Sequence, residues 1–302
     1  MTEEKKYKKE WSFSFEQLGD DLKDAFQNLT GTKEGEDPVK HETFTAGVDG
    51  ATSARVRIDL SVGETDIAAL PVGSTDVIVA DLTHIGEIKF VADTNDEGER
   101  VVSLSHVSTP NDWIKNIFNW VGNSRRLRWD IHLNPTLPTD LEVVGGVGKS
   151  DLDLSGLNLK SLRVSSGAGE INLTLPGGVY SARVDCGVGQ VNLTVKHGAT
   201  LDLQLGGGTG EINLTIEDGA SVSTRIRAGV GAVNVRVPEA AAVKLNAKSG
   251  IGDISVAPRI PRVSGSSSGF DRSGMWQSPG YEASDLPITI QYEGGVGSLS
   301  VK

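Results

Sequence analysis

The chain contains very little cysteine, since Cys186 is the only one among 302 residues. No disulfide can therefore form within the chain, and a zinc site built from several cysteines is excluded. Long apolar runs are also missing: no segment approaches the roughly 20 apolar residues that a membrane-spanning helix requires. The N-terminal sequence lacks the apolar stretch that is typical of a signal peptide. From these absences we expect a soluble, cytoplasmic protein that is at most peripheral to the inner face of the membrane.

An excess of basic charge is missing as well. The chain has 29 Lys and Arg against 40 Asp and Glu, which gives a formal net charge of -11 and a pI near 5.0. A nucleic-acid-binding protein needs a broad basic face for the phosphates, so no nucleic-acid partner is expected. The few histidines lie at positions 41, 84, 106, 132 and 197 without metal-binding or catalytic spacing. We therefore predict no enzyme activity, no cofactor, and no catalytic or metal-binding residues.

Glycine, in contrast, is abundant, with 37 residues, and it recurs at a fixed interval. The segments VGKSDLDL, AGEINLTL, VGQVNLTV, TGEINLTI, VGAVNVRV, IGDISV and VGSLSV share one turn pattern. Their glycines are Gly148, Gly169, Gly189, Gly210, Gly231, Gly252 and Gly297, and the first six are spaced 21, 20, 21, 21 and 21 residues apart. A period near 20 residues indicates a solenoid, in which each repeat stacks on the one before it.

One of these turns, GGVGKSD from Gly145 to Asp151, looks at first like a phosphate-binding loop. That motif needs a glycine five residues before the last one, and Val143 stands there. An alternating strand pattern follows instead of a helix. We therefore assign Lys149 and Ser150 to a corner of the solenoid.

Side chains within each repeat alternate in polarity. Ile171, Leu173 and Leu175 share one parity, and Asn172 and Thr174 share the other, so the aliphatic residues should point inward and the polar ones outward. Stacking predicts an interior column of Val164, Val184, Leu205, Ile226 and Ala247. Two outward columns are predicted, one of Asn172, Asn192, Asn213 and Asn234 and one of Arg163, Arg183 and Arg225. Cys186 falls among small residues and is expected to fill buried space.

These patterns predict an all-β fold, a single parallel β-solenoid of about 20–21-residue rungs flattened into two sheets, with an N-terminal amphipathic helix and a short inserted helix. The predicted parts are a charged segment 1–40 with a helix at about 15–30, a β module 45–129 with a hairpin and a helix at about 110–122, and a regular solenoid 130–302. Within the last part, residues 258–285 are rich in Ser, Gly and Pro and are expected to form a loop before the final rung, GGVGSLSV.

The serial glycine turns, the closing GGVGSLSV and the segment SVGETDIAAL resemble the bacterial toastrack, or putative-adhesin, β-solenoid family. The resemblance covers about residues 45–302, and SVGETDIAAL is similar to the N-terminal toastrack module. Relatives include membrane-tethered modules linked to envelope-stress and cell-wall-antibiotic responses. The resemblance implies no catalytic residues. It implies instead a scaffold or interaction module that works in bacterial envelope-stress physiology.

Three sets of residues are candidates for docking a partner or a membrane surface. They are Phe15, Leu18, Leu22 and Phe26 on the first predicted helix, Trp113, Ile117 and Trp120 on the second, and Arg163, Arg183 and Arg225 on the outward face. Each set has a structural alternative: the helices could cap or plug the solenoid, and the arginines could simply solvate a sheet face. A protein partner or self-association is expected first, and a membrane surface second.

The predicted function is therefore a non-catalytic cytoplasmic scaffold or interaction module. Two alternatives stay open at this point. One is a solenoid enzyme with a carboxylate-lined lateral groove, and the other is a peripheral membrane-surface binding protein.

Overall fold

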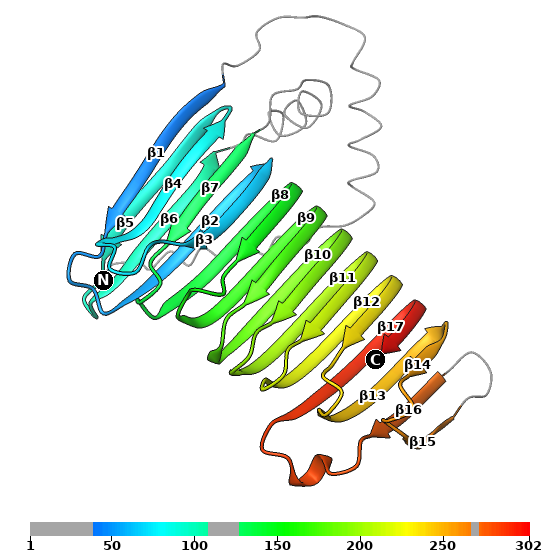
Figure 1. The fold of residues 1–302 in the computed structure, drawn as a ribbon. Helices are drawn as coiled ribbons and strands as arrows, with labels where there is room; N and C mark the ends of the chain where they lie inside the picture. Colours follow the sequence, from blue (N-terminus) through cyan, green and yellow to red (C-terminus); the bar gives the residue numbers. More distant parts are fainter. Residues whose placement is uncertain (1–38, 108–126, 267–271) are drawn as a thin grey trace, which may run out of the picture. The chain divides into compact units, whose positions relative to one another are not determined.

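The computed structural model describes residues 39–107, 127–266 and 272–302. The predicted helices at about 15–30 and 110–122 lie outside these residues and stay predictions. Val39–Lys302 form one compact unit, and its described regular elements are β-strands and one short 3-10 helix (Figure 1). The boundary predicted between residues 129 and 130 falls inside strand β7 (Arg128–Leu133).

The first seven strands precede the regular repeats. They are β1 (Lys40–Gly47), β2 (Ser53–Val62), β3 (Glu64–Ala69), β4 (Asp76–His84), β5 (Glu87–Thr94), β6 (Glu99–Val107) and β7. The following strands are β8 (Thr139–Asp153), β9 (Leu159–Leu175), β10 (Gly178–Val195), β11 (Ala199–Ile216), β12 (Ser221–Arg236), β13 (Ala242–Ile251), β14 (Ile254–Val256), β15 (Arg262–Ser266), β16 (Arg272–Gln277) and β17 (Pro287–Val301), with the 3-10 helix η1 (Tyr281–Ala283) between the last two.

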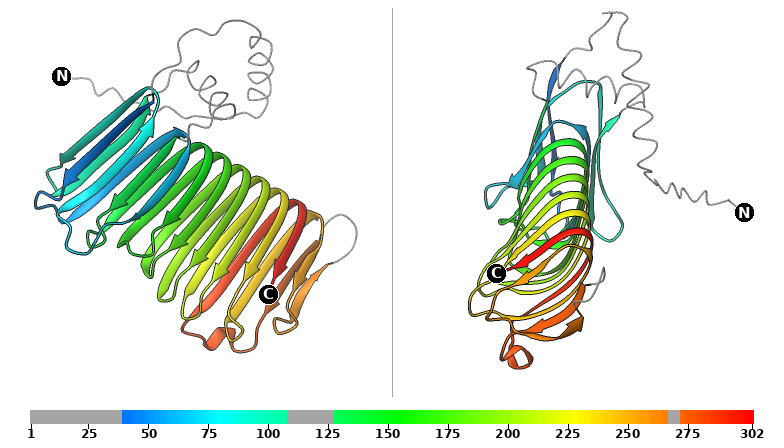
Figure 2. Two further views of the ribbon diagram at one scale, coloured as in Figure 1. Left: turned by 45° about the horizontal axis from the view of Figure 1, so that its top comes forward. Right: turned by 90° about the vertical axis from the view of Figure 1, so that its right-hand side faces the viewer.

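Strands β8 to β12 each form one complete rung of the predicted solenoid. A rung has a first run, a corner at the repeat glycine and a second run, and neighbouring rungs pair in parallel and in register, as with Val164 and Val184 or Asn172 and Asn192. The first runs make one layer, here called the first sheet, and the second runs make the other, the second sheet. Figure 2 shows these two-layered rungs side by side.

Two columns of glycine build the corner. Gly210 has φ 142°, where residues with a Cβ are strained, and a Cβ there would overlap the carbonyl oxygen of Gly189 in the rung before. Gly208, two residues earlier, does not have a positive φ, yet a Cβ would collide with the carbonyl oxygen of Gly187. The rungs of β9 to β12 therefore need the pattern Gly-x-Gly, because their backbones stack too closely for a side chain at either position.

The interior follows the predicted parity. Val164, Val184, Leu205 and Ile226 are all buried and belong to one continuous apolar core. The column of small residues around Cys186 is also present, since Cys186 lies between Ser166 and Gly207. The side chain of Cys186 is buried, as the sequence predicted.

The order of the rungs differs from the prediction at one place. Strand β17, the final repeat, lies between β12 and β13, so that Tyr292 separates Ile226 from Ala247 in the interior column (Figure 1). Gly297 likewise separates Gly231 from Gly252. The predicted direct contact of these rungs was wrong. A common period specifies how rungs stack but leaves open which one comes next, and the chain between β13 and β17 is long enough to return.

The segment 258–285, predicted as a loop, contains two strands and the 3-10 helix. Strand β16 pairs antiparallel with β13, and β15 pairs antiparallel with β16. The prediction was wrong because the Ser, Gly and Pro composition of this segment carries no information about the unpaired edge of β13. An exposed β13 would leave a row of backbone N–H and C=O groups unpaired, and β16 satisfies them. The solenoid is thus parallel in its centre and antiparallel near this end.

The other end is also antiparallel. Strands β5 and β6 form the predicted hairpin, with Lys89 opposite Ser105, and β4 pairs antiparallel with both β1 and β7. The rings of Phe44 on β1 and Phe90 on β5 lie 5.4 Å apart and pack against the core from this side. Large aromatic side chains therefore fill the interior where the regular rungs stop.

Candidate functional site

The outward face of the first sheet carries the predicted arginines. Arg163 lies opposite Arg183 on the neighbouring strand, but Gln204 separates Arg183 from Arg225. The three predicted arginines therefore share one line across the sheet, with glutamine at the β11 position between the second and the third. The whole line across the sheet, here called the arginine row, is Arg57, Glu142, Arg163, Arg183, Gln204, Arg225 and Gln291.

Most charges in the arginine row are already compensated. Arg57 pairs with Glu142, and Arg183 pairs with Asp185 at 2.6 Å, which raises the pKa of the Arg183 guanidinium through the hydrogen bond and the charge. Arg225 donates two hydrogen bonds to Oε1 of Gln291, at 3.2 and 2.9 Å. Arg163 is exposed and has no ion pair or side-chain hydrogen bond within the described part of the chain. It is the cation of the row best placed to take an external anion.

The outward face of the second sheet carries a hydrogen-bonded asparagine ladder, formed by Asp151, Asn172, Asn192, Asn213 and Asn234. Each Asn Nδ2 donates to the side-chain oxygen of the rung before, at 2.7, 2.8, 3.0 and 2.9 Å in chain order. The sequence predicted the stack but not these bonds. Because the amides satisfy one another, the ladder stabilises the register of the rungs and is not a ligand site.

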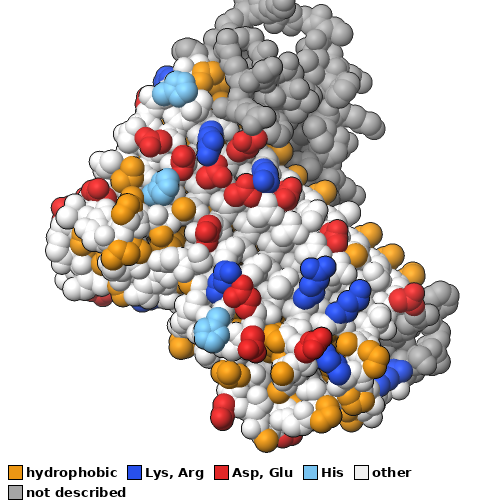
Figure 3. Space-filling model, viewed as in Figure 1, with side chains coloured by type: hydrophobic (Ala, Val, Ile, Leu, Met, Phe, Trp, Pro, Cys, Tyr) orange, Lys and Arg blue, Asp and Glu red, His pale blue; other side chains and the backbone are white. Residues whose placement is uncertain are grey.

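A row of four aspartates continues this line toward the N-terminal strands. Asp81, Asp130, Asp66 and Asp151 lie opposite one another on adjacent strands, an arrangement that like charges disfavour. Figure 3 shows acidic side chains gathered over this part of the face, with basic ones among them. This row was not predicted from the sequence, although Asp66 and Asp151 both stand three residues after a corner glycine.

Basic side chains form ion pairs with two of these aspartates and so compensate part of the negative charge of the row. Arg128 lies 3.2 Å from Asp66, and Nζ of Lys149 donates to Asp151 at 2.7 Å. Partial burial would raise the pKa of Asp151, but the hydrogen bonds from Lys149 and Asn172 outweigh it and lower that pKa below its ordinary value. Among the residues that the structure describes, no group of three or more His, Cys, Asp or Glu side chains is arranged to hold a metal ion.

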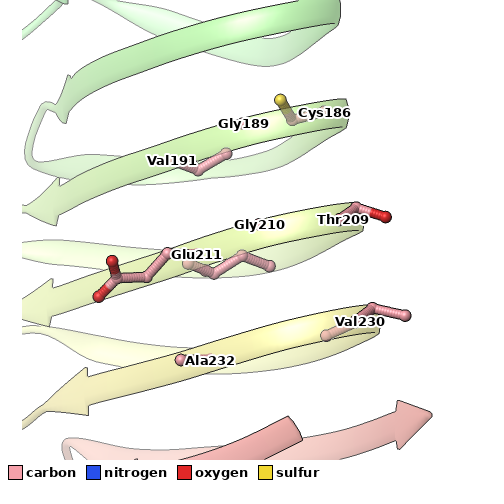
Figure 4. Close-up of a pocket in the computed structure, with 11 residues that line it drawn as sticks. Cys186, Gly189, Val191, Thr209, Gly210, Glu211, Val230 and Ala232 are labelled. Carbon is pink, nitrogen blue, oxygen red and sulfur yellow. The ribbon is translucent and has the colours of Figure 1, made fainter. Parts of the chain in front are cut away.

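A small hollow lies at the corner of β10, β11 and β12 (Figure 4). It measures about 10 Å³, which is the lower limit for a single water molecule. The small side chains of Cys186, Gly207 and Ala228 leave this space, and burial raises the pKa of the Cys186 thiol. The hollow is too small for a substrate, and its cysteine is not activated as a nucleophile.

The remaining predicted site residues, Phe15, Leu18, Leu22, Phe26, Trp113, Ile117 and Trp120, lie outside the described residues. Their docking roles stay predictions. Within the part that is described, no helix is long and apolar enough to span a bilayer.

Comparison with known proteins identifies relatives of this chain. Residues 35–194, more than half of the chain, match the family described as the N-terminal domain of toast_rack, DUF2154. Among solved structures, a putative cell adhesion protein from Clostridium sporogenes is 19% identical over 88% of this chain and 99% of its own, with a TM-score of 0.43. A putative adhesin from Bacteroides fragilis is 12% identical over 90% of this chain and 100% of its own, with a TM-score of 0.36. No curated protein sequence matches this chain significantly.

Proposed function

The chain belongs to the toast_rack family, and from that premise we propose that it is a non-catalytic interaction module whose arginine row binds an acidic segment of a partner protein. The observation that carries the proposal is Arg163, an exposed guanidinium without an ion pair among the described residues, directly beside Arg183 on the neighbouring strand. A guanidinium presents a planar fork of donors that suits carboxylates.

The rest of the row suits a flexible acidic segment. Its members recur at the strand spacing of about 4.8 Å, so carboxylates of one such segment can reach more than one rung. Gln204 offers an amide donor and acceptor between Arg183 and Arg225, and Gln291 does so beyond Arg225. The formal charge of the whole chain is -11, so an acidic partner must be drawn to this row locally and not to the protein as a whole.

We further propose that the module acts in the cytoplasm, in bacterial envelope-stress physiology. Support for this comes from the toastrack resemblance and from the sequence features that predict a soluble chain. An enzyme with a carboxylate-lined groove has less support: the aspartate row lies on a sheet face, and Asp66 and Asp151 in it are held by ion pairs.

Capture from native lysate tests the arginine row. The whole chain should retain a partner that the double variant Arg163→Gln, Arg225→Gln retains at least about tenfold more weakly, with binding that weakens as salt rises. The matched control is Arg236→Gln, which removes an exposed arginine from the second sheet instead. Equal retention by all three proteins, or equal loss in the control, would contradict the proposal.

A further inference from the structure

A line of apolar side chains runs along the corner of the rungs, between the two columns of glycine. Each Gly-x-Gly corner has one such middle residue, and the middle residues of neighbouring rungs pair with each other. In order they are Val147, Ala168, Val188, Thr209, Val230, Val296 and Ile251, and Val62, between Ser61 and Gly63, precedes them in the same line. We call the seven from Val147 onward the corner ridge.

The corner ridge becomes more exposed along the stack. The exposed fraction is 2% at Val62, just before the ridge, and within the ridge 38% at Val188, 51% at Val230, 47% at Val296 and 57% at Ile251. Glycine stands on both sides of every member of the ridge, so no neighbouring side chain of the same corner can shield it. Figure 4 shows Thr209 and Val230 at the turning points of their rungs. Because Thr209 is polar, the corner does not require an apolar residue, and the exposed valines need another explanation.

Acidic side chains border the corner ridge on the second sheet. Glu170 and Glu211 each follow the corner glycine directly; in the register Gln190 lies between them, and Lys149, which is paired with Asp151, lies on the other side of Glu170. The side chains of both glutamates are held in place, since Asn172 donates to Glu170 at 2.8 Å and Asn234 donates to Glu211 at 2.9 Å. An occupant of the ridge should therefore be apolar with basic residues beside it.

The described residues stop at Val107, close to the first corner of the line of middle residues, and resume at Leu127. Ser105 on β6 pairs with Asp59, and Arg128 on β7 pairs with Glu64, so the residues between β6 and β7 replace a corner next to that of Val62. Leu127, where the description resumes, is buried, and its carbonyl oxygen accepts a hydrogen bond from the amide of Glu64 at 2.9 Å.

We propose that the corner ridge is the docking surface for the chain's own segment 108–126, which lies outside the described residues. Ser105 and Arg128, which pair before and after that segment, lie one rung from Val62. With the predicted helix at about 110–122 intact, three extended residues and about two helical turns carry Ile117 roughly 20 Å, and Val188 lies four strand spacings away, or about 19 Å. Its sequence supplies the apolar residues Trp113, Ile114, Ile117 and Phe118 and the basic residues Lys115, Arg125 and Arg126.

The ridge and the arginine row are separate surfaces, because the arginine row lies on the face of the first sheet and the ridge lies at the corner. Docking on the ridge therefore does not depend on the proposed function. Trp113 and Ile117, which the sequence analysis names as candidates for docking a partner or a membrane, would then bind within the chain. Occupation of the ridge would withhold Trp113 and Ile117 from any partner or membrane.

Engineered disulfides test the proposal directly. In a Cys186→Ala background, the pair Val188→Cys and Ile117→Cys should oxidise within one chain, seen as a faster band on a non-reducing gel and as an intact monomer mass. The control pair is Val179→Cys and Ile117→Cys, since Val179 is 81% exposed and lies at the start of the same strand, away from the corner. Oxidation of both pairs alike, or cross-linked dimers as the main product, would overturn the proposal.

Trypsin provides a second measurement without cysteines. Lys115 lies in the proposed occupant, and Val188→Asp should speed cleavage after Lys115 at least about tenfold by weakening the docked state. Val179→Asp should leave that rate unchanged. Val188→Thr is a second variant for the case that the aspartate disturbs folding. Threonine already stands at the paired position 209, so this variant should fold and should also speed the cleavage. Equal cleavage rates in wild type, Val188→Asp and Val188→Thr would count against docking on the ridge.

Discussion

Thr224 is the polar member of a buried row that is otherwise apolar. It lies between Leu203 and Ile290 on the neighbouring strands, its exposed fraction is 2%, and its hydroxyl has no hydrogen-bond partner among the described residues. A buried hydroxyl without a partner costs free energy because it has lost its hydrogen bonds to water. The inward parity of this position could be predicted from the sequence, since Thr224 falls in the column of Leu203. The missing partner could not, because it depends on the arrangement of neighbouring backbones.

Replacing Thr224 by valine should stabilise the protein. The two side chains have nearly the same shape, so Thr224→Val removes an unsatisfied hydroxyl without opening a cavity, and the free energy of unfolding should rise by about 1 kcal/mol. Chemical denaturation monitored by circular dichroism measures this difference. Thr215→Val is the control, because Thr215 lies on the outward parity of the same repeat and should gain nothing. A destabilised Thr224→Val variant would show that the hydroxyl has a partner, such as an internal water molecule.

Within each rung, the corner is the element that decides whether stacking is possible. Positive φ and close backbone contact are separate demands, and the chain contains glycines that meet only the first. Gly198 has φ 77°, and a Cβ added there would have no atom within 4 Å, whereas at Gly210 an added Cβ would overlap the carbonyl oxygen of Gly189. The two sites therefore separate dihedral strain from the steric limit of stacking.

Gly210→Ala should be far more damaging than Gly198→Ala. At Gly198 the cost is the strain of a Cβ at positive φ, roughly 1–2 kcal/mol. At Gly210 the rungs themselves must separate, so we expect a loss of at least about 4 kcal/mol or failure to fold. Thermal and chemical unfolding of the two variants give the comparison. Similar losses at the two positions would mean that the corner backbones can move apart at little cost.

The sequence predicts the rung itself well, because its evidence is local: the period, the glycines and the alternation of Ile171, Asn172 and Leu173. It predicts rung order less well. All rungs share one register, so nothing in the repeat pattern distinguishes β13 from β17 as the neighbour of β12. The hydrogen-bonded ladder, the aspartate row and the antiparallel β16 are likewise products of pairing between distant segments. A candidate site built from such rows appears only once the rung order is known.

Across the unit from Val39 to Lys302, both ends carry features that discourage further strand pairing. At one end, β5 alternates the charged residues Glu87 and Lys89 with its inward side chains, and Phe44 and Phe90 cover the core. At the other end, the pairing of β15 with β16 is irregular at Val263. Irregular pairing and edge charges both oppose edge-to-edge association. The regular rungs between these ends can therefore remain parallel without offering a long flat edge.

The end of the unit that carries β5, Phe44 and Phe90 is the one that matters for the N-terminal segment. The helix predicted in that segment has two interpretations, a cap on the solenoid or a docking device. If the strands and aromatic residues at this end are sufficient, deletion of residues 1–38 should change the melting temperature by less than about 2 °C. The deletion should instead reduce capture of a protein partner or co-sedimentation with lipid vesicles, since Phe15, Leu18, Leu22 and Phe26 would be lost with it. The control is Phe15→Ser with Leu22→Ser in the full chain, which removes the apolar stripe while keeping the charges. A fall of several degrees in the melting temperature, or aggregation of the shortened protein, would identify the segment as a cap and leave docking to other surfaces.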